Sequence, residues 1–69
     1  MALYRAWRHN MTDCFWLLGS SEADAIESVS LTFGIDVVEW KAVLSSDNHR
    51  VPVGVILDSG GKTFSILRG

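Results

Sequence analysis

Cys14 is the only cysteine in this chain of 69 residues, so no internal disulfide can hold the fold together. Small secreted domains commonly depend on such bridges, and a lone cysteine therefore favours a reducing, cytoplasmic location. A chain this short buries only about 60% of the surface that its unfolded form exposes. We expect residues 1–69 to form a single small domain that is held by packing alone.

The composition excludes two classes of protein. Hydrophobic residues make up 48% of the chain and the formal net charge is only −2, which is atypical of a disordered segment. No apolar run approaches the 18 or more residues expected of a membrane span. We therefore expect a folded domain that does not enter a membrane.

The N-terminal part has the pattern of a β-hairpin. Residues 2–8 and 14–18 are rich in aromatic and aliphatic side chains, and the polar residues 9–13 between them are typical of a turn. A third strand is predicted at residues 37–44, before the polar loop at 45–49.

A second hairpin is predicted at the C-terminal end. The β-prone runs 51–57 and 63–67 flank a glycine-rich stretch, and residues 60–61 suit a two-residue loop because glycine tolerates positive φ. That loop pairs Leu57 with Phe64 on the core side of the sheet. Pro52 should then lie at an edge or beside a bulge, because it cannot donate to a strand ladder.

A helix is predicted between the two sets of strands. Ser21 followed by Asp24 has the form of a capping box, and Gly34 suits the left-handed residue that follows a helix end. Ile26, Val29 and Phe33 form one apolar stripe at helical spacing. Residues 29–33 also alternate with period two, so a strand is the alternative there. The expected fold is α+β, in the order ββαβββ, with the helix on one face of a mainly antiparallel sheet.

No motif identifies a reaction. The segment Gly61-Lys62-Thr63 is similar to the end of a phosphate-binding loop, but Ile56 stands where that motif requires glycine. His9, His49 and Cys14 have neither the spacing of a metal site nor that of a nucleophile pair. We therefore expect a non-enzymatic protein and predict no catalytic residue, no metal ligand and no cofactor.

The distribution of charge is the most informative feature. Residues 13–39 contain six carboxylates and no Lys or Arg. On a helical wheel, Leu31 and Ser28 lie among carboxylates opposite the apolar stripe, which is the pattern of an apolar anchor with an acidic rim. A solvated helix face with one exposed leucine is the alternative. The residues predicted to bind a partner are Glu22, Asp24, Glu27, Leu31, Asp36 and Glu39.

Two other kinds of partner are alternatives. Tyr4-Arg5-Ala6-Trp7-Arg8 interleaves aromatic and basic residues, as in single-stranded nucleic-acid binders, but a sequence pI of about 5.4 opposes direct nucleic-acid binding. Three tryptophans are more than a small core readily hides, so a homodimer joined through a sheet edge or an aromatic patch is the second alternative.

The layout of the chain resembles that of small phage-encoded α+β inhibitors, including anti-CRISPR proteins. The resemblance covers the hairpin at 3–18, the helix start Ser20-Ser21-Glu22-Ala23-Asp24-Ala25-Ile26-Glu27 and the strands after Phe33-Gly34-Ile35-Asp36. It includes no shared motif, so it assigns no site residue. It implies an inhibitor in the host-cell cytoplasm that covers a basic, nucleic-acid-binding surface of a larger complex. The element order also resembles the ubiquitin-like fold, whose ending is similar to Leu67-Arg68-Gly69.

Overall fold

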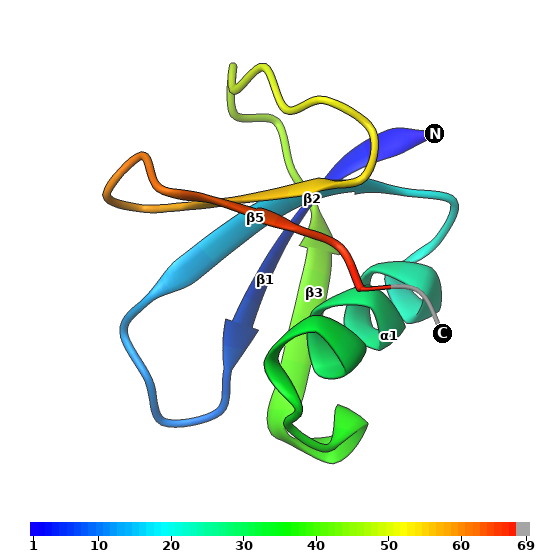
Figure 1. The fold of residues 1–69 in the computed structure, drawn as a ribbon, viewed down its shortest axis with the longest axis vertical. Helices are drawn as coiled ribbons and strands as arrows, with labels where there is room; N and C mark the ends of the chain where they lie inside the picture. Colours follow the sequence, from blue (N-terminus) through cyan, green and yellow to red (C-terminus); the bar gives the residue numbers. More distant parts are fainter. Residues whose placement is uncertain (68–69) are drawn as a thin grey trace.

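The computed structural model describes residues 1–67, and it has the predicted α+β class and ββαβββ order (Figure 1). Arg68 and Gly69, on which part of the resemblance to a ubiquitin-like ending rests, lie outside the described residues. The elements are β1 (Ala2–Arg8), β2 (Cys14–Gly19), α1 (Glu22–Phe33), the 3-10 turn η1 (Val37–Glu39), β3 (Trp40–Leu44), β4 (Val55–Asp58) and β5 (Thr63–Ser65).

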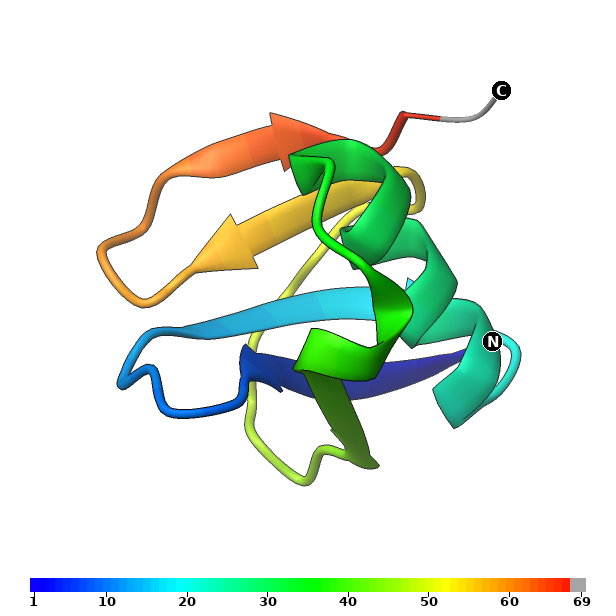
Figure 2. The same cartoon turned by 90° about the horizontal axis from the view of Figure 1, so that it is seen from below.

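The five strands form one antiparallel sheet in the order β3-β1-β2-β4-β5. Figure 2 shows α1 across one face of this sheet and the connection from β3 to β4 behind the other face. The helix therefore covers one face, as predicted, and residues 45–54 cross the second. β3 and β5 are the two edge strands of the sheet, and self-association through either of them stays a prediction.

The core lies between α1 and the sheet. Alternate residues of the central strands face the helix, so Ala6 of β1 and Leu17 of β2 are fully buried while their chain neighbours point to the second face. The small Ala25 lets α1 approach the sheet closely. The buried cluster consists of Tyr4, Ala6, Leu17, Ala25, Val29, Trp40, Ala42 and Ile56.

The predicted helix caps are confirmed. The backbone N–H of Asp24 donates to Ser21 Oγ over 3.1 Å, and the Asp24 carboxylate accepts from the backbone N–H of Ser20 over 2.9 Å. At the other end Gly34 adopts φ 69°, and its N–H donates to the Ser30 carbonyl over 2.9 Å. Residues 29–33 are therefore helical, and the strand alternative is wrong.

The buried stripe of α1 is rotated from the predicted one. Ser28, expected on the outer face, is only 3% exposed, whereas Ile26 is half-buried. The backbone of α1 approaches the sheet through its smallest residues, so Ala25 and Ser28 share the inner face with Val29. The close approach of the α1 backbone to the sheet, more than the hydrophobicity of its side chains, therefore determines which face of α1 is buried.

The register predicted for the second hairpin is wrong by one residue. Phe64 pairs with Ile56, and Leu57 pairs with Thr63. Asp58 causes the difference, because its carboxylate accepts from the N–H groups of Gly60 and Lys62 over 2.9 and 2.8 Å and closes a longer loop than two glycines would. Since a one-residue shift exchanges the two faces, Ile56 enters the core and Leu57 faces the other side.

Two predicted strands begin later than expected. Residues 37–39 form the turn η1 because the Asp36 carboxylate accepts from the Val38 N–H over 3.3 Å. Pro52 lies in a turn before β4, where its carbonyl accepts from the Val55 N–H over 3.3 Å and Gly54 adopts φ 82°. Pro52 therefore precedes the strand β4.

Within residues 1–67, no helix has the length and apolar character needed to cross a membrane.

Candidate interaction surface

The outer side of α1 carries exposed carboxylates, as the sequence predicts. Glu22 and Glu27 are exposed, whereas Asp24 is half-buried and holds the helix N-terminus through its bond to Ser20. Negative charge in the first turn also complements the helix dipole. Glu22 and Glu27 are therefore available to a partner, while Asp24 has a structural role in the cap.

The segment after α1 turns back along the helix. Ser30 Oγ donates to the carbonyl oxygen of Ile35, which fixes the chain just after the helix ends. The Asp36 cap then starts η1 and leaves Val37 and Val38 46% and 78% exposed. Two adjacent β-branched side chains thus stand at the surface beside the acidic helix.

A shallow, widely open apolar groove lies between α1 and η1. Its volume is about 400 Å³. Ala23 and Ile26 form the helix side, the Glu27 side chain forms part of the wall, and Val37 and Val38 form the other side. We call these five residues the acid-edged groove. The arrangement combines exposed apolar area with a carboxylate, as the centre and rim of a protein interface do.

Of the six predicted site residues only Glu27 lines this groove, and the other five, Glu22, Asp24, Leu31, Asp36 and Glu39, do not. Leu31 is 47% exposed, as expected, but it is not among the residues that line the groove. Glu39 lies 4.0 Å from Arg8, oxygen to nitrogen, and both side chains are partly exposed. The Arg8 cation partly neutralises Glu39, whereas among residues 1–67 no Lys or Arg lies within 4.0 Å of Glu22, Glu27 or Asp36.

The valines of the groove were missed by the sequence analysis, because a β-prone run from Val37 favours a strand. A signal for them is present in the sequence. Asp36 followed by Glu39 has the same capping-box spacing as Ser21 and Asp24, and it indicates a helical turn at the start of that run.

The aromatic and basic segment of β1 does not form one continuous platform. Tyr4 is 9% exposed and belongs to the core. Arg5 lies over the Trp7 ring, 5.4 Å from its centroid, on the second face of the sheet. Arg8 lies on the helix face beside Glu39. The two cations are thus separated by the sheet, as the alternation of strand residues predicts.

The two histidines do not gather with other metal-binding side chains. The His49 ring packs against Trp16 with centroids 4.4 Å apart. Asp47 accepts from Trp16 Nε1 over 2.8 Å, and this hydrogen bond lowers the pKa of Asp47 from its ordinary value of 3.8. Among residues 1–67, no three His, Cys, Asp or Glu side chains are grouped as a metal site requires.

Comparison with known proteins gives no family assignment. No protein-family model, curated protein or solved structure matches this chain.

Proposed function

We propose that this protein is a non-enzymatic protein-binding module that acts as an inhibitor. Its acidic helix face docks on the basic surface of a partner, such as a nucleic-acid-binding complex, and blocks access to that surface. The observation that carries the proposal is the acid-edged groove, which an exposed valine pair and Glu27 line together. Such an inhibitor would act in the cytoplasm of a host cell if a phage encodes it.

Charge supports this choice of partner. No Lys or Arg occurs between residues 13 and 39, so a partner that approaches α1 and η1 meets Glu22, Glu27 and Asp36 first. Complementary charge accelerates encounter and rejects partners of the wrong sign. The net charge of −2 understates this effect, because the cations lie elsewhere in the chain.

The apolar part of the groove contributes binding free energy that charged groups alone do not provide. Val38 is 78% exposed, and with Val37 and Ile26 it offers apolar area that a docked partner would remove from water. Burial of apolar area contributes about 25 cal/mol per Å². Carboxylates at the edge then set orientation, while the valines contribute the affinity.

Charge reversal within the groove tests the proposal. The tagged protein is used to capture partners from a lysate of its source cells, and the captured proteins are identified by mass spectrometry. Capture of a basic nucleic-acid-binding protein is expected, with at least tenfold weaker capture by Glu27→Lys and by Val38→Lys. The captured partner should also lose its nucleic-acid binding as the wild-type protein is added.

The matched control is a charge change away from the groove. Val38→Lys and Thr63→Lys each raise the net charge by one, but Thr63 lies on the edge strand β5 and does not line the groove. Thr63→Lys should capture the partner normally, and all variants should unfold at nearly the wild-type temperature. Undiminished capture by Glu27→Lys would reject the proposal.

A further inference from the structure

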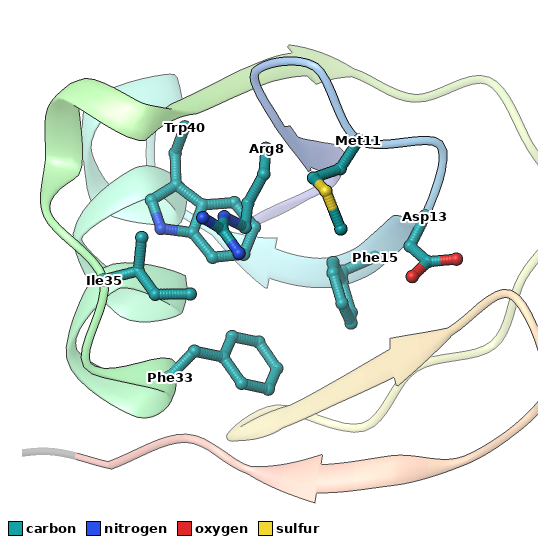
Figure 3. Close-up of a pocket in the computed structure, with 7 residues that line it drawn as sticks. All are labelled: Arg8, Met11, Asp13, Phe15, Phe33, Ile35 and Trp40. Atoms are coloured by element: carbon teal, nitrogen blue, oxygen red, sulfur yellow. The ribbon is translucent and has the colours of Figure 1, made fainter.

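A second cavity lies at the opposite side of η1, between the β1–β2 turn and the C-terminal end of α1 (Figure 3). Its volume is about 240 Å³. It shares no lining residue with the acid-edged groove. The residues that line it are Arg8, Met11, Asp13, Phe15, Phe33, Ile35 and Trp40.

Three aromatic rings form most of the wall. The centroids of Phe15 and Phe33 are 5.0 Å apart, and each lies 5.8 Å from the centroid of Trp40. The three rings therefore pack against one another, and their sides that face the cavity suit contact with a further ring. An apolar cavity of about 150 Å³ is large enough for benzene, so this cavity has room for an aromatic ring and one small substituent.

Two N–H donors that lack acceptors are buried in the lining at one end of the cavity. Arg8 and Trp40 are paired residues on the neighbouring strands β1 and β3, and Figure 3 shows both at the same end of the cavity. Trp40 is only 4% exposed, and neither its Nε1 nor the Nε of Arg8 finds a hydrogen-bond acceptor among residues 1–67. Both nitrogen atoms have almost no accessible surface, so a ligand oxygen at this end of the cavity contacts the rest of the Arg8 guanidinium, whose side chain is 35% exposed.

The positive charge of Arg8 is also incompletely neutralised. Its contact with Glu39 is 4.0 Å long, and both side chains remain partly exposed. A carboxylate that reaches Arg8 from inside the cavity could form shorter hydrogen bonds to the guanidinium, which binds carboxylates with a matching planar geometry. The carboxylate of Asp13 stands at the opposite part of the lining and disfavours a second negative group on the ligand.

We propose that this cavity binds a small aromatic monocarboxylate. The ring packs against the exposed sides of Phe15 and Phe33, and the carboxylate accepts hydrogen bonds from the guanidinium of Arg8. The inference is independent of the proposed partner-binding function, because the acid-edged groove lies on other residues.

Titration of the ¹⁵N-labelled protein tests this site. The probes are sodium phenylacetate, its neutral analogue phenylacetamide, and sodium acetate, each added to roughly 10 mM because ligands with so few atoms bind weakly. Phenylacetate should shift the Trp40 indole N–H resonance, because its ring packs beside a residue of the cavity wall, and the shift should reach saturation. Phenylacetamide, which lacks the charge, should bind about tenfold more weakly, and acetate, which lacks the ring, should give no saturable shift. A Trp40 resonance that phenylacetate leaves unmoved, or equal binding of phenylacetamide, would overturn the proposal.

The matched variants are two arginines of the same strand on opposite faces. Arg8→Gln should weaken phenylacetate binding about tenfold, whereas Arg5→Gln should leave it unchanged because Arg5 lies over Trp7 on the second face. Ile35→Phe fills the cavity without changing charge and should abolish binding while the spectrum stays that of a folded protein. Equal binding by Arg8→Gln and Arg5→Gln, or full binding by Ile35→Phe, would contradict the site.

Discussion

Asp47 shows how one side chain places a whole loop. By sequence, residues 45–49 are simply a polar connection. In the structure, Asp47 accepts from Trp16 Nε1 over 2.8 Å, and the His49 ring packs on the same indole. These contacts hold the connection on the face of the sheet that α1 leaves open. Trp16 thereby gains a partner for its indole N–H outside the core.

Acid should release this contact. The hydrogen bond from Trp16 lowers the pKa of Asp47 below 3.8 in the folded protein. A lowered pKa means that the contribution to stability is present above the unfolded value and is lost as pH falls through the folded value. The Trp16 indole N–H resonance should therefore titrate with a midpoint below pH 3.8. Asp47→Asn should remove that titration, and a midpoint above 3.8 in the wild type would show that the contact does not stabilise the carboxylate.

Among the elements, the β4–β5 hairpin depends on the side chain that opens its turn. Asp58 accepts from two backbone N–H groups of the loop, and its own N–H donates to the Lys62 carbonyl over 2.8 Å. Asp58→Ala should lower the free energy of unfolding by about 1–3 kcal/mol, because two loop donors lose their acceptor. Chemical denaturation measures the change. Ser59→Ala, an exposed position in the same turn, should change it by less than about 0.5 kcal/mol.

The helix and the hairpin show which features of the fold could be predicted from the sequence. The start and end of α1 were predictable because Ser21, Asp24 and Gly34 act on backbone groups within a few residues of themselves. The register of the β4–β5 hairpin was not predictable. Two adjacent glycines favour a two-residue loop, whereas the Asp58 side chain stabilises a longer one.

The candidate site was predictable only in its charge. The exposed carboxylates of α1 follow from the sequence, but the apolar side of the groove depends on how Val37 and Val38 fold back beside Ile26. The aromatic cavity likewise joins Phe15 of β2 to Phe33 of α1 and Trp40 of β3. Contacts between distant segments leave no local sequence pattern. The spacing of residues along the chain therefore indicated neither the acid-edged groove nor the aromatic cavity.

At the scale of the whole molecule, stability rests on one buried cluster to which the helix and the strands both contribute. Leu17 is fully buried at its centre. Leu17→Ala should lower the free energy of unfolding by about 2–5 kcal/mol. That is a large part of the roughly 5–15 kcal/mol typical of a domain. Urea denaturation followed by circular dichroism measures this loss.

The neighbouring residue provides the control for that substitution. Leu18 is half-buried on the opposite face of the same strand, so Leu18→Ala should cost clearly less. Equal losses for the two variants would mean that both faces of the sheet contribute alike to stability.

The pairing of β2 with β4 constrains how the chain can fold. Residues 1–44 hold the first hairpin, the helix and β3. One flank of β2, with Phe15, Trp16 and Leu17, is paired only when residues 45–54 have crossed the sheet and placed β4 beside it. Any state of the chain in which β4 has not docked exposes an unpaired, apolar edge, which is the kind of surface on which partly folded chains aggregate.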